Sequence, residues 1–256
     1  MLRISDLKLP LGHAPEALAP AICNRLGVPE RDLLSHVIAR RAHDARKKAA
    51  ILMVYTVDVA LRDEAAVLAR FERDSQVRPR PDTDYRLVAQ APKDFKGPRP
   101  VVVGAGPCGL FAGLILAQMG FKPIILERGK VVRERTKDTW GLWRRGELNP
   151  ESNVQFGEGG AGTFSDGKLY SQIKDPRLLG RKVLKEFVMA GAPEEILTEA
   201  HPHIGTFRLV TMVESLRETI EALGGEYRWQ HRVDDFDIET AADGQRKLKG
   251  LHLSTG

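Results

Sequence analysis

Hydrophobic and polar residues follow two different periods in the first part of the chain. Between residues 51 and 61 an apolar residue recurs at every second position, which predicts a strand with one buried face. The apolar residues of 18–26 recur at helical spacing instead, and Gly27 follows them as a helix stop. A strand and a helix that each bury one face predict a small α/β domain with a shared core.

Further segments complete this domain. Residues 2–9 predict a first strand with a break in its register, residues 35–43 an extended strand, and residues 76–78 a short last strand. Asp63 can cap a second helix. The apolar residues of that helix are expected to be Ala65, Leu68, Ala69 and Phe71. The order strand-helix-strand-strand-helix-strand predicts a ferredoxin-like domain over residues 1–78.

Prolines and charges dominate residues 79–99, and this composition predicts a stiff linker. After it come a β-branched strand at 101–103, an apolar helix that ends at Gly120, and a second buried strand at 124–126. This succession predicts a Rossmann-like dinucleotide-binding domain over residues 100–256. The chain is therefore expected to be an α/β protein.

A glycine-rich turn follows the first strand of the second domain. Gly104, Gly106 and Gly109 form a Gly-x-Gly-x-x-Gly pattern, so the backbone can approach a pyrophosphate and the next helix can turn its amides toward that charge. Glu127 ends the second strand about 20 residues later, where a carboxylate can accept hydrogen bonds from ribose hydroxyls. An acid there suits a dinucleotide without a 2′-phosphate. The turn alone allows NAD and FAD equally.

A second glycine-rich block covers residues 152–169. It holds five glycines between positions 157 and 167, interleaved with Thr163, Ser165 and Asp166. Amides and hydroxyls exposed at such short range suit a loop that wraps a pyrophosphate or a flavin ring. A nicotinamide domain needs no second wrap of this length, so the block favours FAD.

Three more patterns follow the fingerprint. Residues 131–145 predict a charged helix on which Trp140 and Trp143 serve as packing anchors. Residues 209–223 predict an amphipathic helix with apolar positions spaced by four and three. Beyond it we expect one strand with Tyr227, Trp229 and Val233 in alternation, and then a hairpin around Asp243-Gly244.

The composition narrows the chemistry. The chain has 256 residues, a formal net charge of +5 and two cysteines, Cys23 and Cys108, far apart in sequence. This pattern argues against disulfides, zinc and the dithiol class of flavin reductases. His201-Pro202-His203 lacks the further ligands that a metal requires, so no metal site is expected. The sequence shows no signal peptide and no long apolar run, and we expect a cytoplasmic protein without membrane contact.

Basic residues cluster at 40–41 and 46–48, and the same strand-helix plan also carries RNA-binding sheets. Such sheets need exposed aromatic residues for base stacking. Only Tyr55 is available, and it belongs to the apolar set of its strand. The pattern therefore argues against a nucleic-acid partner. We keep an RNA-binding or RNA-modifying flavoprotein as an alternative function.

Several stretches together resemble a known family. They are the Gly104–Gly113 fingerprint, Leu126-Glu127-Arg128-Gly129, the Ser152–Leu169 block, His203-Ile204-Gly205-Thr206 and the Asp44–Lys48 segment. In these residues the chain resembles bacterial FAD-dependent dehydrogenase-like flavoproteins, which share the glutathione-reductase-like FAD fold. The resemblance covers nearly the whole chain, and the Ser152–Leu169 block is its most specific part.

The resemblance implies a set of cofactor-binding residues. Gly104, Gly106 and Gly109 would hold the FAD pyrophosphate and Glu127 the adenosine ribose, with Ala105, Pro107 and Arg128 beside them. Gly159, Gly160, Gly162 and Thr163 would lie along the pyrophosphate and the ribityl chain, with Ser165 and Asp166 near the flavin. Val233 would contact the adenine through its backbone.

The resemblance also implies an FAD-binding oxidoreductase with a small-molecule substrate or an electron-transfer partner. NADH or NADPH is the candidate electron donor, and no catalytic side chain is assigned. A flavin-dependent docking module without turnover is a further alternative. Proteins of this fold continue beyond the equivalent of Gly256, so we expect a fragment or an early-terminated product that binds FAD weakly or not at all.

Overall fold

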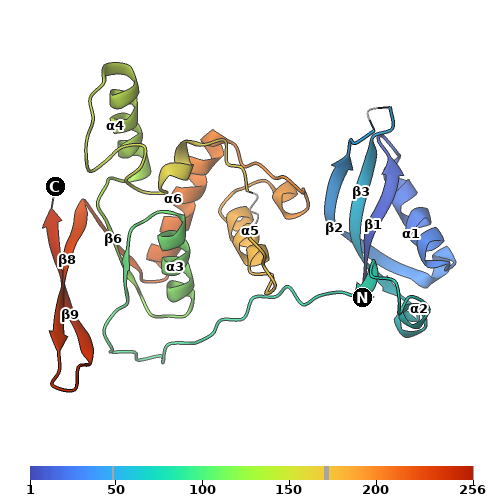
Figure 1. Ribbon diagram of the computed structural model, residues 1–256, viewed down its shortest axis with the longest axis horizontal. Coiled ribbons are helices and arrows are strands. Elements are labelled where there is room, and N and C mark those ends of the chain that lie inside the picture. The colour runs from blue at the N-terminus through green and yellow to red at the C-terminus, as the bar shows by residue number, and fades with distance from the viewer. Residues whose placement is uncertain (48, 170–172, 256) are drawn as a thin grey trace. The chain divides into compact units, whose positions relative to one another are not determined.

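The computed structural model describes residues 1–47, 49–169 and 173–255. The chain is a mixed α/β protein with several sheets (Figure 1). It divides into two compact units. The first unit comprises Met1–Asp84, Leu169–Lys185 and Pro193–His203, and the second comprises Tyr85–Lys168, Glu186–Ala192 and Ile204–Gly256. Within the described residues no helix has the length and apolar character needed to cross a membrane.

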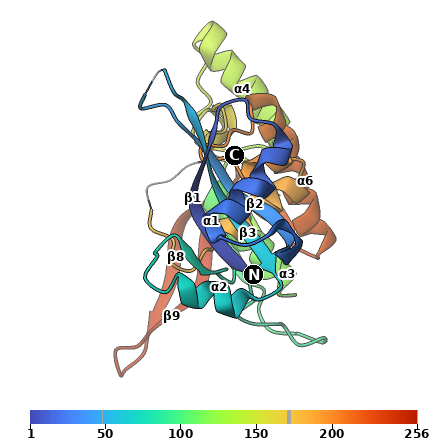
Figure 2. The same ribbon diagram turned by 90° about the vertical axis from the view of Figure 1, so that its right-hand side faces the viewer.

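Residues 1–84 of the first unit form an antiparallel sheet with the helices α1 and α2, in the predicted order. The elements are β1 (Leu2–Pro10), α1 (Leu18–Leu26), β2 (Leu33–Asp44), β3 (Leu52–Leu61), α2 (Glu64–Arg70) and β4 (Val77–Pro79). The strands lie in the order β2-β3-β1-β4. Both α1 and α2 cover the same face of the sheet (Figure 2). The core lies between that face and the two helices.

Local signals in the first unit are confirmed. The register of β1 shifts between Ile4 and Leu7, at the predicted break. Gly27 ends α1 in the left-handed region at φ 60°. The Asp63 carboxylate caps α2 by accepting from the Ala66 amide at 2.9 Å.

The inward face of α2 differs from the expectation. Val67 is its buried residue, and Leu68 and Phe71 pack against the core, whereas Ala65 and Ala69 are exposed. The expectation that Ala65 and Ala69 contribute to the apolar face of this helix was wrong. Burying a methyl side chain gains little free energy, so alanine does not orient a short helix.

The second unit contains a parallel sheet and a separate hairpin. Its elements are β5 (Val101–Val103), α3 (Pro107–Gln118), β6 (Ile124–Glu127), α4 (Val132–Arg145), α6 (Thr206–Ala222), β7 (Glu226–Trp229), β8 (His231–Thr240) and β9 (Arg246–Thr255). The 3₁₀ turn Ala161–Phe164 also belongs to the second unit, whereas the 3₁₀ turn Glu194–Leu197 belongs to the first. Helix α5 (Gly180–Met189) belongs to the first unit up to Lys185 and to the second from Glu186. The sheet order is β5-β6-β7, with both pairs parallel, and β8 pairs with β9 alone.

Helices α3 and α6 bury the faces that their periodicity predicts, but α6 ends at Ala222 and leaves Leu223 41% exposed. Tyr227, Trp229 and Val233 do not share one strand. Gln230 has φ 59° between β7 and β8, so Val233 belongs to the hairpin strand that follows. The turn at Gln230 therefore lets the chain leave the parallel sheet and enter β8.

Trp140 and Trp143 of α4 are 45% and 54% exposed. They contact each other edge to face, with ring centroids 5.7 Å apart, and the Arg144 guanidinium lies over Trp140. Trp143 also contacts the Phe164 ring edge to face, with centroids 5.8 Å apart, so the two tryptophans pack against each other and against the second glycine block. They lie outside the core, because the buried side of α4 carries Val132, Arg135 and Thr139.

Candidate functional site

The glycine turn lies between β5 and the first turn of α3. A side chain at Gly109 would place its Cβ 1.8 Å from the Gly104 carbonyl oxygen, so only glycine fits there. Gly106 is the N-cap of α3 and has no side-chain cap. The first amides of a helix have no partner within the helix, and the helix dipole is positive at this end. The turn therefore presents an anion-binding surface.

Glu127 lies buried at the end of β6. Its carboxylate accepts hydrogen bonds from the backbone amides of Ala105 at 2.7 Å, Gly129 at 2.8 Å and Gly157 at 3.0 Å. Two carboxylate oxygens offer about four acceptor positions, so capacity remains for a ligand hydroxyl. The predicted ribose acceptor therefore also joins the glycine turn, the end of β6 and the second glycine block.

The second glycine block packs directly on the turn. The Gly159 amide donates to the Ala105 carbonyl at 2.8 Å. A Cβ on Gly160 would lie 3.0 Å from the Pro107 Cδ and 3.2 Å from the Gly106 Cα, which is closer than ordinary van der Waals contact. The two glycine-rich segments therefore form one surface, and Pro107 borders it as the first residue of α3.

The later part of that block makes internal contacts. Thr163 is buried, and its hydroxyl donates to the Glu158 carbonyl at 3.4 Å. The Ser165 hydroxyl donates to the Gly162 carbonyl at 2.7 Å, and the Asp166 carboxylate pairs with Lys168 at 3.2 Å. Gly162, Thr163, Ser165 and Asp166 do not line the pocket described below. Their predicted contact with a flavin and its ribityl chain stays a prediction.

Arg135 of α4 organises the start of the block, and the sequence interpretation missed it. The side chain is fully buried, and its guanidinium donates to the carbonyls of Asn153 at 2.7 Å, Val154 at 2.6 Å and Glu158 at 2.6 Å. Burial lowers the pKa of Arg135 to about 10, so it remains charged at neutral pH. Its three-residue spacing from buried Val132 was the available signal.

Glu158 supplies a second buried charge beside Arg135. Its carboxylate accepts from the Val132 amide at 2.7 Å and pairs with Arg217 of α6 at 3.0 Å. Burial raises the pKa of this carboxyl, and the Val132 amide and Arg217 oppose the rise. The glycine block is thereby fixed to α4 and α6.

A pocket of about 290 Å³ opens beside the glycine turn and Glu127. Its lining comprises Val103, Gly104, Gly106, Leu126, Glu127, Arg128, Gln155, Phe156, Gly157, Gly160, His231, Arg232 and Val233. Six of the predicted cofactor residues meet here, from the turn, the end of β6, the second block and β8. Gln155, Phe156, His231 and Arg232 were not predicted, because nothing in their local pattern shows that they converge.

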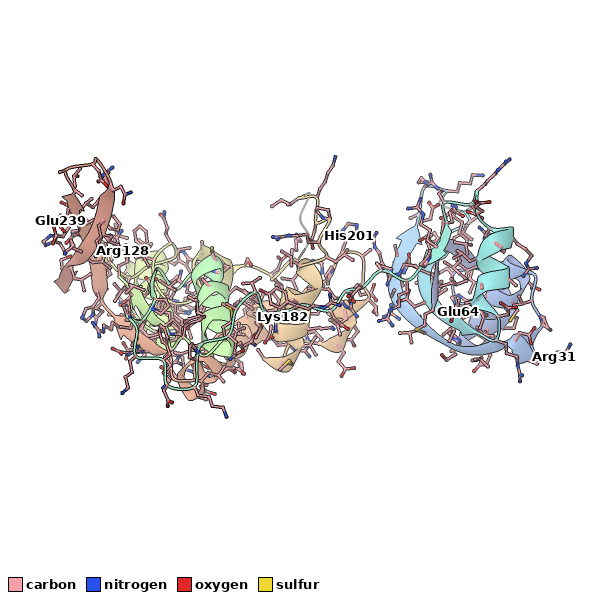
Figure 3. All side chains as sticks on the ribbon, turned by 90° about the horizontal axis from the view of Figure 1, so that it is seen from below. Arg31, Glu64, Arg128, Lys182, His201 and Glu239 are labelled. Atoms are coloured by element: carbon pink, nitrogen blue, oxygen red, sulfur yellow. The ribbon has the colours of Figure 1, made fainter. Side chains whose placement is uncertain are left out.

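Charged side chains surround one side of this pocket. The guanidinium of Arg128, which is labelled in Figure 3, lies over the Phe156 ring, 3.8 Å from its centroid, and donates to Glu151 at 2.8 Å. Arg232 of β8 donates to the other Glu151 oxygen at 2.8 Å. Glu151 therefore links the end of β6 to the hairpin.

We expect the Glu151 carboxyl to titrate below the usual range of glutamate. The hydrogen bond from Arg128 lowers the pKa most, and Arg232 adds to it. A lowered pKa means that this link stabilises the fold above the unfolded-state value and is lost as pH falls through the folded-state value. A carboxyl-carbon NMR titration should show a larger upward shift in Arg128→Ala than in Arg232→Ala. Equal midpoints in all three proteins would contradict this assignment.

The residues that line the pocket offer binding groups and include no cysteine. Within the described part of the chain, no group of three or more histidine, cysteine or acidic residues could hold a metal ion. His203 belongs to the first unit and is not among the residues that line the pocket. The chemistry that this arrangement supports is recognition of a ligand with a hydroxyl-bearing sugar and a diphosphate.

Comparisons with known proteins give three findings. Residues 1–60 match a family described as a domain of unknown function, DUF8436. A Clostridium beijerinckii protein described as uncharacterized is 41% identical over 233 residues, which are 91% of this chain and 43% of that protein. The chain thus spans less than half of this relative. The crystal structure of Thermovibrio ammonificans THI4 matches at 20% identity and a TM-score of 0.39, covering 60% of this chain and 46% of that one.

Proposed function

We propose that the second unit binds FAD and that the protein is a flavin-dependent oxidoreductase. The observation that carries the proposal is the single pocket formed by Gly104, Gly106, Glu127, Gly160 and Val233. These residues come from separate segments and supply the groups that a dinucleotide requires. Bound flavin would supply the electron transfer, with a reduced nicotinamide as the donor we favour and a small molecule as the substrate.

The size of the pocket indicates that it holds only part of FAD. Its volume of about 290 Å³ lies at the lower end of the roughly 300–1,000 Å³ range of ligand pockets, so it suits one half of FAD. The adenosine half fits best, because Glu127 can accept hydrogen bonds from ribose hydroxyls. The backbone amides of the first turn of α3 would then donate to the diphosphate. The flavin half would follow Gly159, Gly160, Gly162 and Thr163 toward Ser165.

Replacing Gly106 with alanine should block the ligand and leave the fold intact. The φ of Gly106 is −73°, and an added Cβ would meet only the Gly160 Cα at 3.9 Å, an ordinary contact. The same Cβ would occupy the surface that a pyrophosphate must approach. We expect ADP affinity, measured by isothermal titration calorimetry, to fall roughly tenfold or more, which is about 1.4 kcal/mol.

Gly250→Ala in β9 is the matched control, because its Cβ would meet only Asp237 at 3.8 Å and it lies outside the pocket lining. ADP and FAD should compete for one site. Riboflavin, which lacks the phosphates, should not displace ADP. Equal ADP affinity in Gly106→Ala and the native chain would contradict the proposal. So would displacement of ADP by riboflavin, or the lack of saturable ADP binding.

A further inference from the structure

A row of side chains crosses the sheet of the first unit on the face opposite α1 and α2. Asp58 of β3 pairs in register with Arg3 of β1 and with Val37 of β2. The neighbours of Asp58 in β3, Val57 and Val59, point into the helix-covered core, so Asp58 points to the other face. Even so, Asp58 is only 5% exposed. Other parts of the same unit therefore cover Asp58.

Asp58 binds two arginines. Arg3 donates to its carboxylate through two nitrogens, at 2.7 and 2.8 Å, in the bidentate geometry that guanidinium groups prefer. The Arg80 Nε lies 3.3 Å from the second oxygen. One buried carboxylate thus holds two positive charges together.

A third arginine closes the site. Arg181 of α5 lines a cavity of about 200 Å³ together with Arg3, Arg80, Asp58, Thr83 and Asp175. Its guanidinium donates to the Leu197 carbonyl, and among the described residues it forms no ion pair. Burial lowers the pKa of Arg181 most, and repulsion from Arg3 and Arg80 lowers it further, while attraction to Asp58 opposes these effects. Three arginines therefore share one partly buried space.

The carboxylates present do not balance these charges. Asp58 is engaged by Arg3 and Arg80, and the Asp175 carboxylate accepts from the amides of Leu179 at 3.0 Å and Gly180 at 2.7 Å, where it caps α5. With three guanidinium groups and two carboxylates, the cavity carries an excess positive charge. Holding like charges together in a partly buried space is unfavourable unless an anion joins them.

We propose that this cavity binds the phosphate group of a small molecule. Guanidinium forks match phosphate oxygens in geometry and charge, and the Thr83 hydroxyl is an additional donor. A cavity of about 200 Å³ is smaller than the roughly 300 Å³ at which ligand pockets begin, so it takes the phosphate and leaves the rest of the molecule outside. This site lies in the first unit and does not depend on the proposed FAD site.

Calorimetric titration of the full chain with inorganic phosphate and with pyrophosphate at low ionic strength tests the proposal. We expect saturable binding that falls roughly tenfold or more in Arg181→Ala, which is about 1.4 kcal/mol. Arg177→Ala, an exposed residue outside the cavity lining, should bind like the native chain. Without phosphate, Arg181→Ala should be at least as thermostable as the native chain. Adding phosphate should raise the Tm of the native chain and leave the Tm of Arg181→Ala unchanged.

Gly106→Ala separates this site from the glycine turn, since phosphate binding should persist in that variant. Binding that is lost in Gly106→Ala and kept in Arg181→Ala would overturn the proposal and assign the anion to the turn. Lack of saturable binding would overturn it as well. Salt-sensitive binding of tRNA that is tighter than phosphate binding and is lost in Arg181→Ala would replace the small molecule with a nucleic-acid backbone.

Discussion

Arg135→Met should lower the free energy of unfolding by about 3–5 kcal/mol, because three carbonyls, two of them in buried hydrogen bonds, lose the guanidinium that donates to them. Methionine fills much of the same volume, so the loss reports the hydrogen bonds more than a cavity. The three carbonyls belong to Asn153, Val154 and Glu158, which begin the second glycine block. Urea unfolding followed by far-UV circular dichroism gives the free-energy difference.

Arg133→Met is the matched control, on the same helix and one residue from the buried face. Arg133 pairs with Glu214 at the surface, and its side chain is 68% exposed. Exposed ion pairs contribute about 0–1 kcal/mol, so this variant should unfold close to the native chain. If the two variants lost equal stability, Arg135 would not organise the glycine block.

Glu127→Gln should remove about 3 kcal/mol of stability and weaken nucleotide binding together. The amide is nearly isosteric, but its nitrogen is a donor and faces backbone N–H groups that also donate. At least one of the amides of Ala105, Gly129 and Gly157 then stays buried without an acceptor. Urea unfolding measures the stability, and the exchange rates of these three amides, followed by NMR, show whether the carboxylate protects them.

Glu218→Gln on α6 serves as the control, because that side chain is exposed and such substitutions change stability by about 0.5 kcal/mol or less. Unchanged exchange at all three amides in Glu127→Gln would show that the carboxylate does not hold the turn. Lost ADP binding with unchanged stability would reduce Glu127 to a ligand contact alone.

Hydrophobic periodicity, together with the residues that cap or end helices, predicted most of the fold. Alternation along β3, helical spacing in α1 and α6, the Gly27 stop and the Asp63 cap each depend on neighbours within a few residues, and the structure contains all of them. Such features are local, so the sequence records them directly. Where the side chains were small, as at Ala65, the pattern carried too little burial energy to fix an orientation.

The candidate site was predicted only in part, for a different reason. Gly104, Gly106 and Glu127 stand at fixed distances from one strand, so their convergence follows from the strand-turn-helix plan. The amide partners of Glu127 were not predictable, because every residue except proline carries a backbone amide and identity does not mark the one that bonds. Arg135 was missed because a buried arginine in a charged helix looks like a solvated one.

The bond from the Gly157 amide to Glu127 spans thirty residues of chain. During synthesis the amino-terminal segments leave the ribosome first. The glycine turn and β6 therefore emerge before Gly157. Until Gly157 has been synthesised, the Glu127 carboxylate lacks one of its three amide donors. The surface that the two glycine-rich segments share is completed only when the second glycine block has emerged, so it forms late in the synthesis of this chain.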